Sequence, residues 1–370
     1  MRVLVVSSGS TYSTTDVYDG LVSGLRQLGH EVVSYDTTYH VWVEDKKFRY
    51  MLAEAGMKGS APPRRGRFPD KPEYHQYSEE LRFNALKDVL VEARRQVVDL
   101  VILVSAYLFS DEMLSMLSLR HDTPHGIGVA PTAIVFTESP YEDPRQIRQA
   151  ALVDAVFVND RVNLDAYQAV TKAWHLPMGF SPATHFPPAR RPEVVHDVVF
   201  VGVGYPERVA LLEGADWSGI NLGLYGDWRF VGKRSPLRPF IHNGIIENAR
   251  ATALYVGSRV GLNMFRSCVD YWGRGKAQAR GDDLNPRSYE LAACRVPQVT
   301  EARLGWYDVF GACKYDATFT CSAEMERKIR QLLEDDDLRE RVADEQLRAV
   351  QGHSYVDRAA RIVSCLTGEG

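Results

Sequence analysis

The segment Asn285-Pro-Arg-Ser-Tyr-Glu290 places polar side chains at the start of a short helical pattern. Arg287 and Glu290 lie three residues apart, a spacing that puts both on one face of a helix. A helix N-terminus attracts phosphate, and an arginine adds paired hydrogen bonds to phosphate oxygens. The carboxylate of Glu290 has acceptor oxygens that suit the paired hydroxyls of a ribose. The alternative is a local pair in which Glu290 offsets the charge of Arg287.

A glycine-rich turn, Gly202-Val-Gly204-Tyr-Pro-Glu-Arg208, follows an apolar run and opens another helical pattern. A dinucleotide fingerprint requires a third glycine where this chain has Glu207, so the pattern argues against NAD binding. A turn that faces phosphate, with Arg208 beside it, is the prediction that remains. A simple connecting turn is the alternative.

Further polar groups follow the next predicted strands. Tyr225 ends a strand and is predicted to flank a nucleobase, although a packed aromatic is the alternative. The stretch from His242 to Ile245 precedes a helical pattern, and from the sequence alone it is simply a turn. A basic stretch after residue 265 suggests neutralisation of a diphosphate, with a solvated loop as the alternative; its cations are Arg266, Arg274, Lys276 and Arg280.

Glu138 is the predicted catalytic base. It follows the apolar run 129–136, and residues just beyond the carboxyl end of such a strand face ligands in open α/β sheets. Pro140 restricts the residue before it to extended geometry. A carboxylate there can take the proton of an attacking hydroxyl. The alternative is a turn carboxylate that caps a helix near Asp143; His125 and Asp111 are weaker candidates for the base.

A basic cluster lies in the proline- and glycine-rich stretch 57–76, which we interpret as a long exposed loop. The cluster is predicted to contact the acceptor, meaning the molecule that carries the attacking hydroxyl. Phosphate contacts made by such a cluster would suit DNA. A solvated loop that serves a small acceptor is the alternative. The cluster consists of Lys58, Arg64, Arg65, Arg67 and Lys71.

The elements that must position these residues alternate between strand and helix. Apolar runs at 3–6, 31–35, 99–104, 129–136 and 154–158 are separated by helical patterns at 16–28, 43–56, 78–97 and 144–151. After the proline-rich stretch 181–194 the rhythm restarts at 196–203 and ends in three helices near 323–334, 336–350 and 355–366. This alternation predicts an α/β fold of two doubly wound, Rossmann-like domains facing a cleft. The expected domains are 1–185, 186–355 and a final helix, 356–370, that crosses back to the first.

Composition sets broad limits on the partners. The formal net charge of −4 gives no global reason to expect nucleic acid or an anionic membrane. The five cysteines include no C-x-x-C pair, which argues against a zinc site and fits a reducing cytosol. No apolar stretch is long enough to span a bilayer, and the first residues lack a signal-peptide pattern. A cytoplasmic protein without membrane partners is therefore expected.

Several segments resemble the GT-B glycosyltransferases, in the branch related to the spore-maturation protein CgeB. The segment Leu284–Cys294 resembles the donor-binding helix of that branch, with Arg295 where the branch usually has glycine. The segments 197–202, 255–263, 322–358, 25–32 and 136–140 resemble other parts of the fold. In this resemblance Glu290 would bind the donor ribose. Asp282 lies eight residues earlier, where retaining members place an acid that contacts the transferred sugar.

The resemblance implies a glycosyltransferase that moves a sugar from a nucleotide donor, expected to be a UDP-sugar, to an acceptor hydroxyl. The acceptor remains open, from a small molecule or glycan to a hydroxymethylated base in DNA. No metal or other cofactor is expected. A nucleotide-sugar epimerase and a non-catalytic sugar-binding module are the alternatives. The donor-binding residues predicted are Gly202, Gly204, Arg208, Tyr225, His242, Ile245, Lys276, Asp282, Asn285, Arg287, Ser288 and Glu290.

Overall fold

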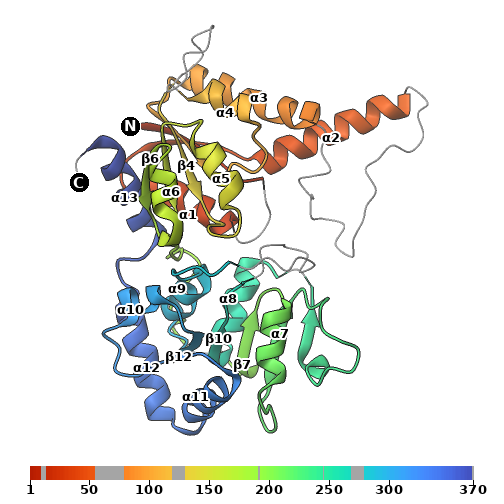
Figure 1. Ribbon diagram of the computed structural model, residues 1–370, viewed down its shortest axis with the longest axis vertical. Coiled ribbons are helices and arrows are strands. Elements are labelled where there is room, and N and C mark those ends of the chain that lie inside the picture. The colour runs from red at the N-terminus through yellow and green to blue at the C-terminus, as the bar shows by residue number, and fades with distance from the viewer. Residues whose placement is uncertain are drawn as a thin grey trace. The chain divides into compact units, whose positions relative to one another are not determined.

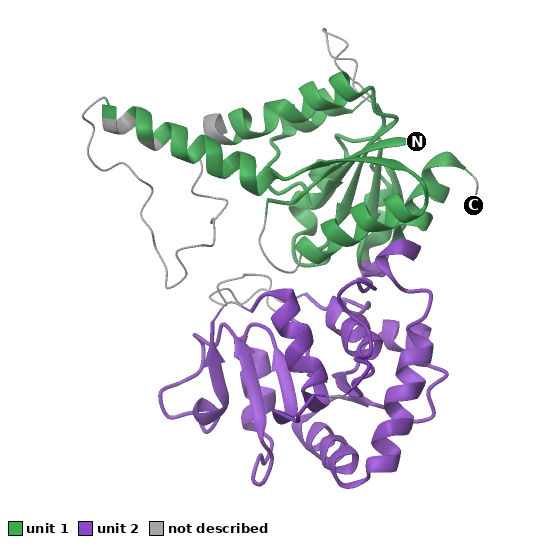
Figure 2. Ribbon diagram, turned by 180° about the vertical axis from the view of Figure 1, so that it is seen from behind, with its two compact units in different colours: residues 1–159, 163–176, 358–370 green, residues 160–162, 177–357 purple. Residues whose placement is uncertain are grey.

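The chain folds into two compact units. The computed structural model describes residues 1–9, 14–54, 79–118, 130–190, 192–244, 246–267 and 279–368. Unit 1 is formed by residues 1–159, 163–176 and 358–370, and unit 2 by residues 160–162 and 177–357 (Figure 2). The last helix, α13 (Tyr355–Thr367), therefore begins in unit 2 and continues in unit 1 from Arg358.

Unit 1 is built on a six-stranded parallel sheet with the order β2-β1-β3-β4-β5-β6. Strands β3 and β4 are buried along their whole length, as apolar runs covered on both faces should be. Helices α2 and α3 run side by side as a long pair (Figure 1). The elements of unit 1 are β1 (Arg2–Val6), α1 (Thr15–Gln27), β2 (Glu31–Tyr35), α2 (Thr37–Glu54), α3 (Glu79–Gln96), β3 (Leu100–Val104), α4 (Asp111–Leu117), β4 (Thr132–Phe136), α5 (Asp143–Ala150), β5 (Ala155–Val158), α6 (Leu164–Gln168) and β6 (Lys172–His175).

Unit 2 has its own six-stranded parallel sheet, ordered β12-β11-β10-β7-β8-β9. The chain moves from β7 outward to β9, then returns to the other side of β7 with β10. The order thus reverses between β7 and β10, where open α/β sheets bind their ligands. The elements are β7 (His196–Val201), α7 (Pro206–Glu213), β8 (Leu222–Gly226), β9 (Ile241–Asn243), α8 (Asn248–Val256), β10 (Ser258–Asn263), α9 (Pro286–Ala293), β11 (Gln298–Glu301), α10 (Leu304–Phe310), β12 (Thr318–Phe319), α11 (Ser322–Glu334) and α12 (Asp336–Ala349).

Helices cover both faces of the sheet in unit 2. One face packs under α7, α11 and α12 around residues such as Phe200 and Leu262. The other packs under α8 and α9, where Val199, Tyr255 and Leu291 meet. This two-sided burial is the doubly wound α/β arrangement predicted from the sequence. No helix in the part of the chain that the structure describes has the length and apolar character needed to cross a membrane.

Some elements differ from the sequence predictions. Helix α2 begins at Thr37, six residues before the predicted start. His242 lies in the short strand β9, not in a turn. The strands β6, β9 and β12 and the helices α4, α6 and α10 were not predicted. These strands have only two to four residues, too few to show a clear hydrophobic pattern.

Candidate functional site

The polar opening of α9 lies at the point where the strand order of unit 2 reverses. Asn263 is the last residue of β10 and is fully buried. Its amide nitrogen donates to Asn285 Oδ1 at 3.1 Å and to Ser288 Oγ at 2.7 Å, and its oxygen accepts from Asn285 Nδ2 at 2.9 Å. Asn285 also caps α9 by accepting from the backbone N–H of Ser288. These bonds fix the start of α9 against the end of β10.

Arg287 is anchored in the same network. One terminal nitrogen donates to Asn263 Oδ1 at 3.2 Å, and the guanidinium lies 4.9 Å from the centre of the Phe200 ring. Its Nε is buried and has no hydrogen-bond partner among the described residues. An unpartnered buried donor on a cation costs free energy unless an anion accepts from it. The geometry of Arg287 therefore suits a phosphate at the start of α9.

Glu290 lies one turn further along α9 and is mostly buried. The hydroxyl of Tyr255 donates to Glu290 Oε2 at 3.3 Å. Burial raises the pKa of Glu290, while the positive charge of Arg287 and the hydrogen bond from Tyr255 lower it in part. A ring nitrogen of His185 lies within 4.8 Å of the Glu290 carboxylate. The charge of Arg287 thus acts on Glu290, as expected if the two residues form a local pair that offsets charge. The contact of Glu290 with a ribose stays a prediction.

Gly202 and Gly204 allow close packing beside this network. A Cβ on Gly204 would lie 2.2 Å from Cε3 of Trp228, and one on Gly202 would lie 2.9 Å from a terminal nitrogen of Arg287. Gly226, at the end of β8, has a φ of 124° and packs against the backbone of Gly202. A Cβ on Gly226 would lie 2.2 Å from the Gly202 carbonyl oxygen. The glycines are therefore required by the fold here. A phosphate contact from this turn stays a prediction.

Arg208 braces the loop after β10. Its guanidinium donates to the carbonyls of Val203 at 2.9 Å and Phe265 at 3.2 Å, and only 6% of the residue is exposed. Arg208 therefore links the loop after β7 to the loop after β10, and its predicted phosphate contact stays a prediction. Arg266, also in the loop after β10, has its guanidinium carbon 5.5 Å from the centre of the Tyr205 ring.

Tyr225 and His242 form an aromatic stack at the edge of the sheet. Their rings are parallel, 4.4 Å apart, and the Tyr225 hydroxyl lies 2.8 Å from His196 Nε2. Tyr225 is only 6% exposed, whereas His242 is exposed. His242 stacks on the buried Tyr225 ring, as in the alternative of a packed aromatic, and the contact of Tyr225 with a nucleobase stays a prediction. Burial, His196 and Arg250 lower the pKa of His242, which keeps its ring neutral and suited to stacking.

Glu138, in unit 1, lies two residues beyond the carboxyl end of β4, as predicted from the sequence. Its carbonyl accepts from the N–H groups of Tyr141 and Glu142, so residues 138–142 form the turn that leads into α5. Burial raises the pKa of Tyr107, and the charge of Glu138 raises it further. Ser105 and Ala106, after β3, have positive φ values of 60° and 44°, a backbone conformation that is uncommon in residues other than glycine.

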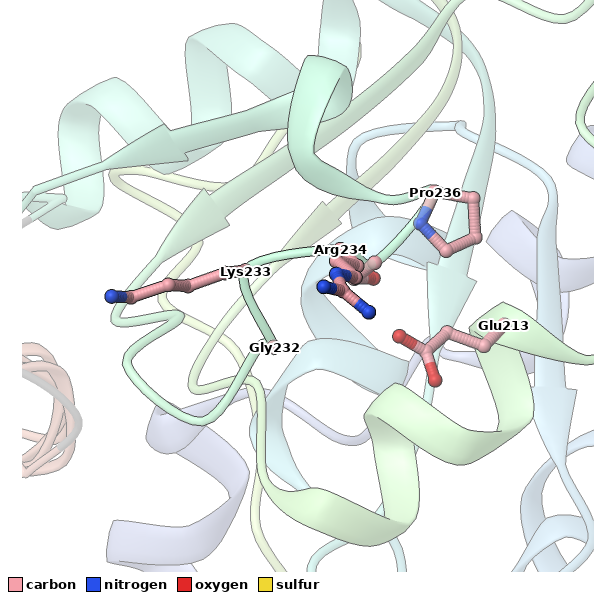
Figure 3. Close-up of a pocket in the computed structure, with 6 residues that line it drawn as sticks. Glu213, Gly232, Lys233, Arg234 and Pro236 are labelled. Carbon is pink, nitrogen blue, oxygen red and sulfur yellow. The ribbon is translucent and has the colours of Figure 1, made fainter.

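Several predicted residues lie outside the described part of the chain. These are Lys58, Arg64, Arg65, Arg67, Lys71, His125, Ile245, Arg274 and Lys276. A hollow of about 660 Å³ lies elsewhere in unit 2, between the end of α7 and the loop after β8 (Figure 3). It is lined by Glu213 and residues 232–236, and it includes none of the predicted donor-binding residues.

Sequence reasoning missed three residues of the site: Asn263, Tyr255 and His185. Asn263 carried a usable signal, since it is a polar residue at the carboxyl end of an apolar strand. Tyr255 faces Glu290 from a helix 35 positions earlier, and no sequence pattern links the two. His185 lies in the proline-rich stretch that was interpreted as a linker.

Comparisons with known proteins agree with this architecture. Residues 206–364 match the model of a family described as glycosyl transferase-like. No curated protein matches the sequence. The glycosyltransferase AviGT4 of avilamycin A biosynthesis has a similar structure, with a TM-score of 0.60, 15% identity, and coverage of 99% of this chain and 97% of that one.

Two further solved structures are similar over their whole length. Phage T4 β-glucosyltransferase has a TM-score of 0.56 at 12% identity, covering 99% of each chain, and has also been solved with UDP and Mn²⁺. Anabaena HepE in complex with UDP-glucose has a TM-score of 0.57 at 12% identity, covering 100% of each chain. Identities this low establish a shared fold. The chain therefore has the GT-B fold of these glycosyltransferases, and its residues 206–364 match the glycosyl transferase-like family.

Proposed function

We propose that the protein is a glycosyltransferase that moves a sugar from a UDP-sugar to an acceptor hydroxyl. One observation carries the proposal: Arg287 is held at the start of α9 with a buried Nε that lacks a partner among the described residues. Glu290 follows one turn later on α9, where it is proposed to bind the ribose. UDP is preferred as the nucleotide because HepE, which shares the fold, was solved with UDP-glucose.

In this proposal unit 2 holds the donor and unit 1 the acceptor. Arg287 and the N–H groups of α9 stabilise the charge that develops on the leaving diphosphate. These groups perform the work that a metal ion does in other transferases, so the reaction is proposed to need no metal. Glu138 takes the proton from the acceptor hydroxyl if the reaction inverts the anomeric configuration.

The acceptor is proposed to carry a free hydroxyl, and a hydroxymethylated base in DNA is one candidate. The support is the cluster of basic residues between Lys58 and Lys71, together with a shared fold with a DNA-modifying β-glucosyltransferase. A gel-shift titration with duplex DNA at several salt concentrations tests this. Binding that weakens steeply with salt supports DNA; no binding at low salt removes it.

The experiment for the function is a donor screen. UDP-, GDP- and dTDP-sugars are tested for thermal stabilisation and for release of the free nucleotide, each with EDTA or Mn²⁺. We expect UDP-sugars to stabilise the protein and UDP to be released at equal rates under both conditions. A sugar converted without release of UDP would indicate an epimerase instead. If none of the donors stabilised the protein against thermal unfolding, the proposal would be contradicted.

A further inference from the structure

Residues 160–162 form a short segment that joins unit 2 although its neighbours Asn159 and Asn163 belong to unit 1. The segment packs on the loop of residues 281–284, which leads directly into α9. Within unit 2, therefore, a piece of chain distant in sequence supports the loop that carries Asp282.

Asp160 holds this loop through its buried carboxylate, since the residue is only 4% exposed. Its Oδ1 accepts from the N–H of Asp282 at 3.1 Å, and its Oδ2 accepts from the N–H of Asp283 at 3.0 Å. The carbonyl of Asp282 accepts from the N–H of Gly305 at 2.8 Å. Both backbone polar groups of Asp282 are thus bound, and this fixes the backbone position from which its side chain extends.

Arg161 distinguishes the two adjacent acids. Its Nε and one terminal nitrogen donate to the two oxygens of Asp283 at 3.1 and 2.6 Å, and its backbone N–H adds a bond of 2.8 Å. A paired arrangement of this kind satisfies the charge of a buried carboxylate. The carboxylate of Asp282, by contrast, accepts no hydrogen bond from any residue in the described part of the chain. Asp282 is therefore the acid of this pair that remains available to a ligand.

We propose that Asp160 and Arg161 are positioning residues that hold the Asp282 carboxylate toward hydroxyls of the transferred sugar. The inference rests on the proposed function and adds to it the residues that select the sugar, as distinct from those that bind the nucleotide. Asp160 fixes the backbone of Asp282, and Arg161 keeps Asp283 from competing for the same hydroxyls. Loss of either should affect the sugar and spare the nucleotide.

The test compares calorimetric binding of UDP and UDP-glucose by the full chain. In Asp160→Asn an amide nitrogen replaces one acceptor oxygen, so one of the two bonds to the loop, from the N–H of Asp282 or of Asp283, is lost. We expect UDP-glucose affinity to fall roughly tenfold or more, the loss of a charge-assisted hydrogen bond, in this variant and in Asp282→Asn. Affinity for UDP should stay within about threefold of the wild type, a difference below 1 kcal/mol.

Asp308→Asn is the matched control, because Asp308 also binds Arg161 but is exposed, and the hydrogen bond of its carboxylate goes to Arg161 and not to the backbone of the loop. It should bind both ligands as the wild type does. Arg161→Gln should lose UDP-glucose affinity, and Arg161→Lys should recover part of it. Unchanged UDP-glucose binding in Asp160→Asn and Arg161→Gln would overturn the inference, as would equal losses for UDP and UDP-glucose. A wild-type protein that binds neither ligand would instead refute the proposed function.

Discussion

Asn263 and Asn285 form a reciprocal pair in which each side-chain amide donates to the other, at 3.1 and 2.9 Å. The pair joins the end of β10 to the N-cap residue of α9, 22 positions later in the chain. Arg287 donates to the same Asn263 oxygen. One buried amide therefore sets both the helix cap and the position of the cation.

Asn263→Ala should weaken both folding and UDP binding. It leaves Asn285, Ser288 and Arg287 without their shared partner, at a cost of about 1–3 kcal/mol in the free energy of unfolding. UDP affinity should fall roughly tenfold because Arg287 loses its anchor. Urea unfolding and calorimetry measure the two effects.

Asn221→Ala is the control for that variant. Asn221 bonds to His196 and to the Val195 carbonyl, at the start of β7 rather than at its carboxyl end. It should reduce stability and leave UDP affinity unchanged. If Asn221→Ala weakened UDP binding as much as Asn263→Ala, the effect of Asn263 would be global destabilisation alone.

Glu290→Gln should bind UDP roughly tenfold more weakly, as expected for loss of a charge-assisted hydrogen bond, yet be more stable at neutral pH. Burial raises the pKa of Glu290. A raised pKa in an acid means that its stabilising contribution is present below the unfolded pKa and is lost as pH rises through the folded pKa. The buried charge is therefore a cost at pH 7, which glutamine removes.

Thermal unfolding of the ligand-free protein between pH 5 and pH 8 checks this. The advantage of the glutamine variant should grow with rising pH. UDP affinity of the wild type should fall as pH is lowered through the raised pKa, because the acceptor oxygen gains a proton. A variant that is less stable at every pH, with normal UDP affinity, would assign Glu290 to the fold only.

The sequence was sufficient to predict the general architecture, because buried parallel strands such as β3 and β4 leave continuous apolar runs. The last three helices lie within one or two residues of their predicted bounds for a similar reason: their apolar positions recur along one face. Strands β9 and β12 left no such pattern at two or three residues. Arg287 and Glu290 were found because one short helix carries both. Asn263, Tyr255 and Asp160 act through partners 22 to 123 positions away, which no local spacing encodes.

Gly204→Ala should destabilise unit 2 by about 1–3 kcal/mol, as overpacking of a filled site does. The new methyl group would meet the stiff ring of Trp228 at 2.2 Å. Gly232→Ala is the matched control, since a Cβ there meets no atom within 4 Å. Differential scanning calorimetry of both variants checks the difference. Equal melting temperatures would show that the turn has room that the structure does not indicate.

Glu138→Gln should reduce the rate of UDP release from the accepted donor by at least about a hundredfold, the usual contribution of a general base. Donor affinity should stay near the wild-type value, because Glu138 belongs to unit 1. Glu142→Gln is the control from the same turn, where the carboxylate is paired with Arg145 at 2.6 Å. More than a tenth of wild-type turnover in Glu138→Gln would exclude the base role.

Calorimetric titration of UDP into the wild type, Arg287→Gln and Glu213→Gln tests the central claim most directly. Arg287 marks the predicted donor site at α9, and Glu213 lines the separate hollow of Figure 3. We expect the wild type to bind one UDP per chain. The affinity for UDP should fall by roughly tenfold or more in Arg287→Gln and should not change in Glu213→Gln. UDP binding that Glu213→Gln weakens and Arg287→Gln leaves intact, or no binding to the wild type, would contradict the account.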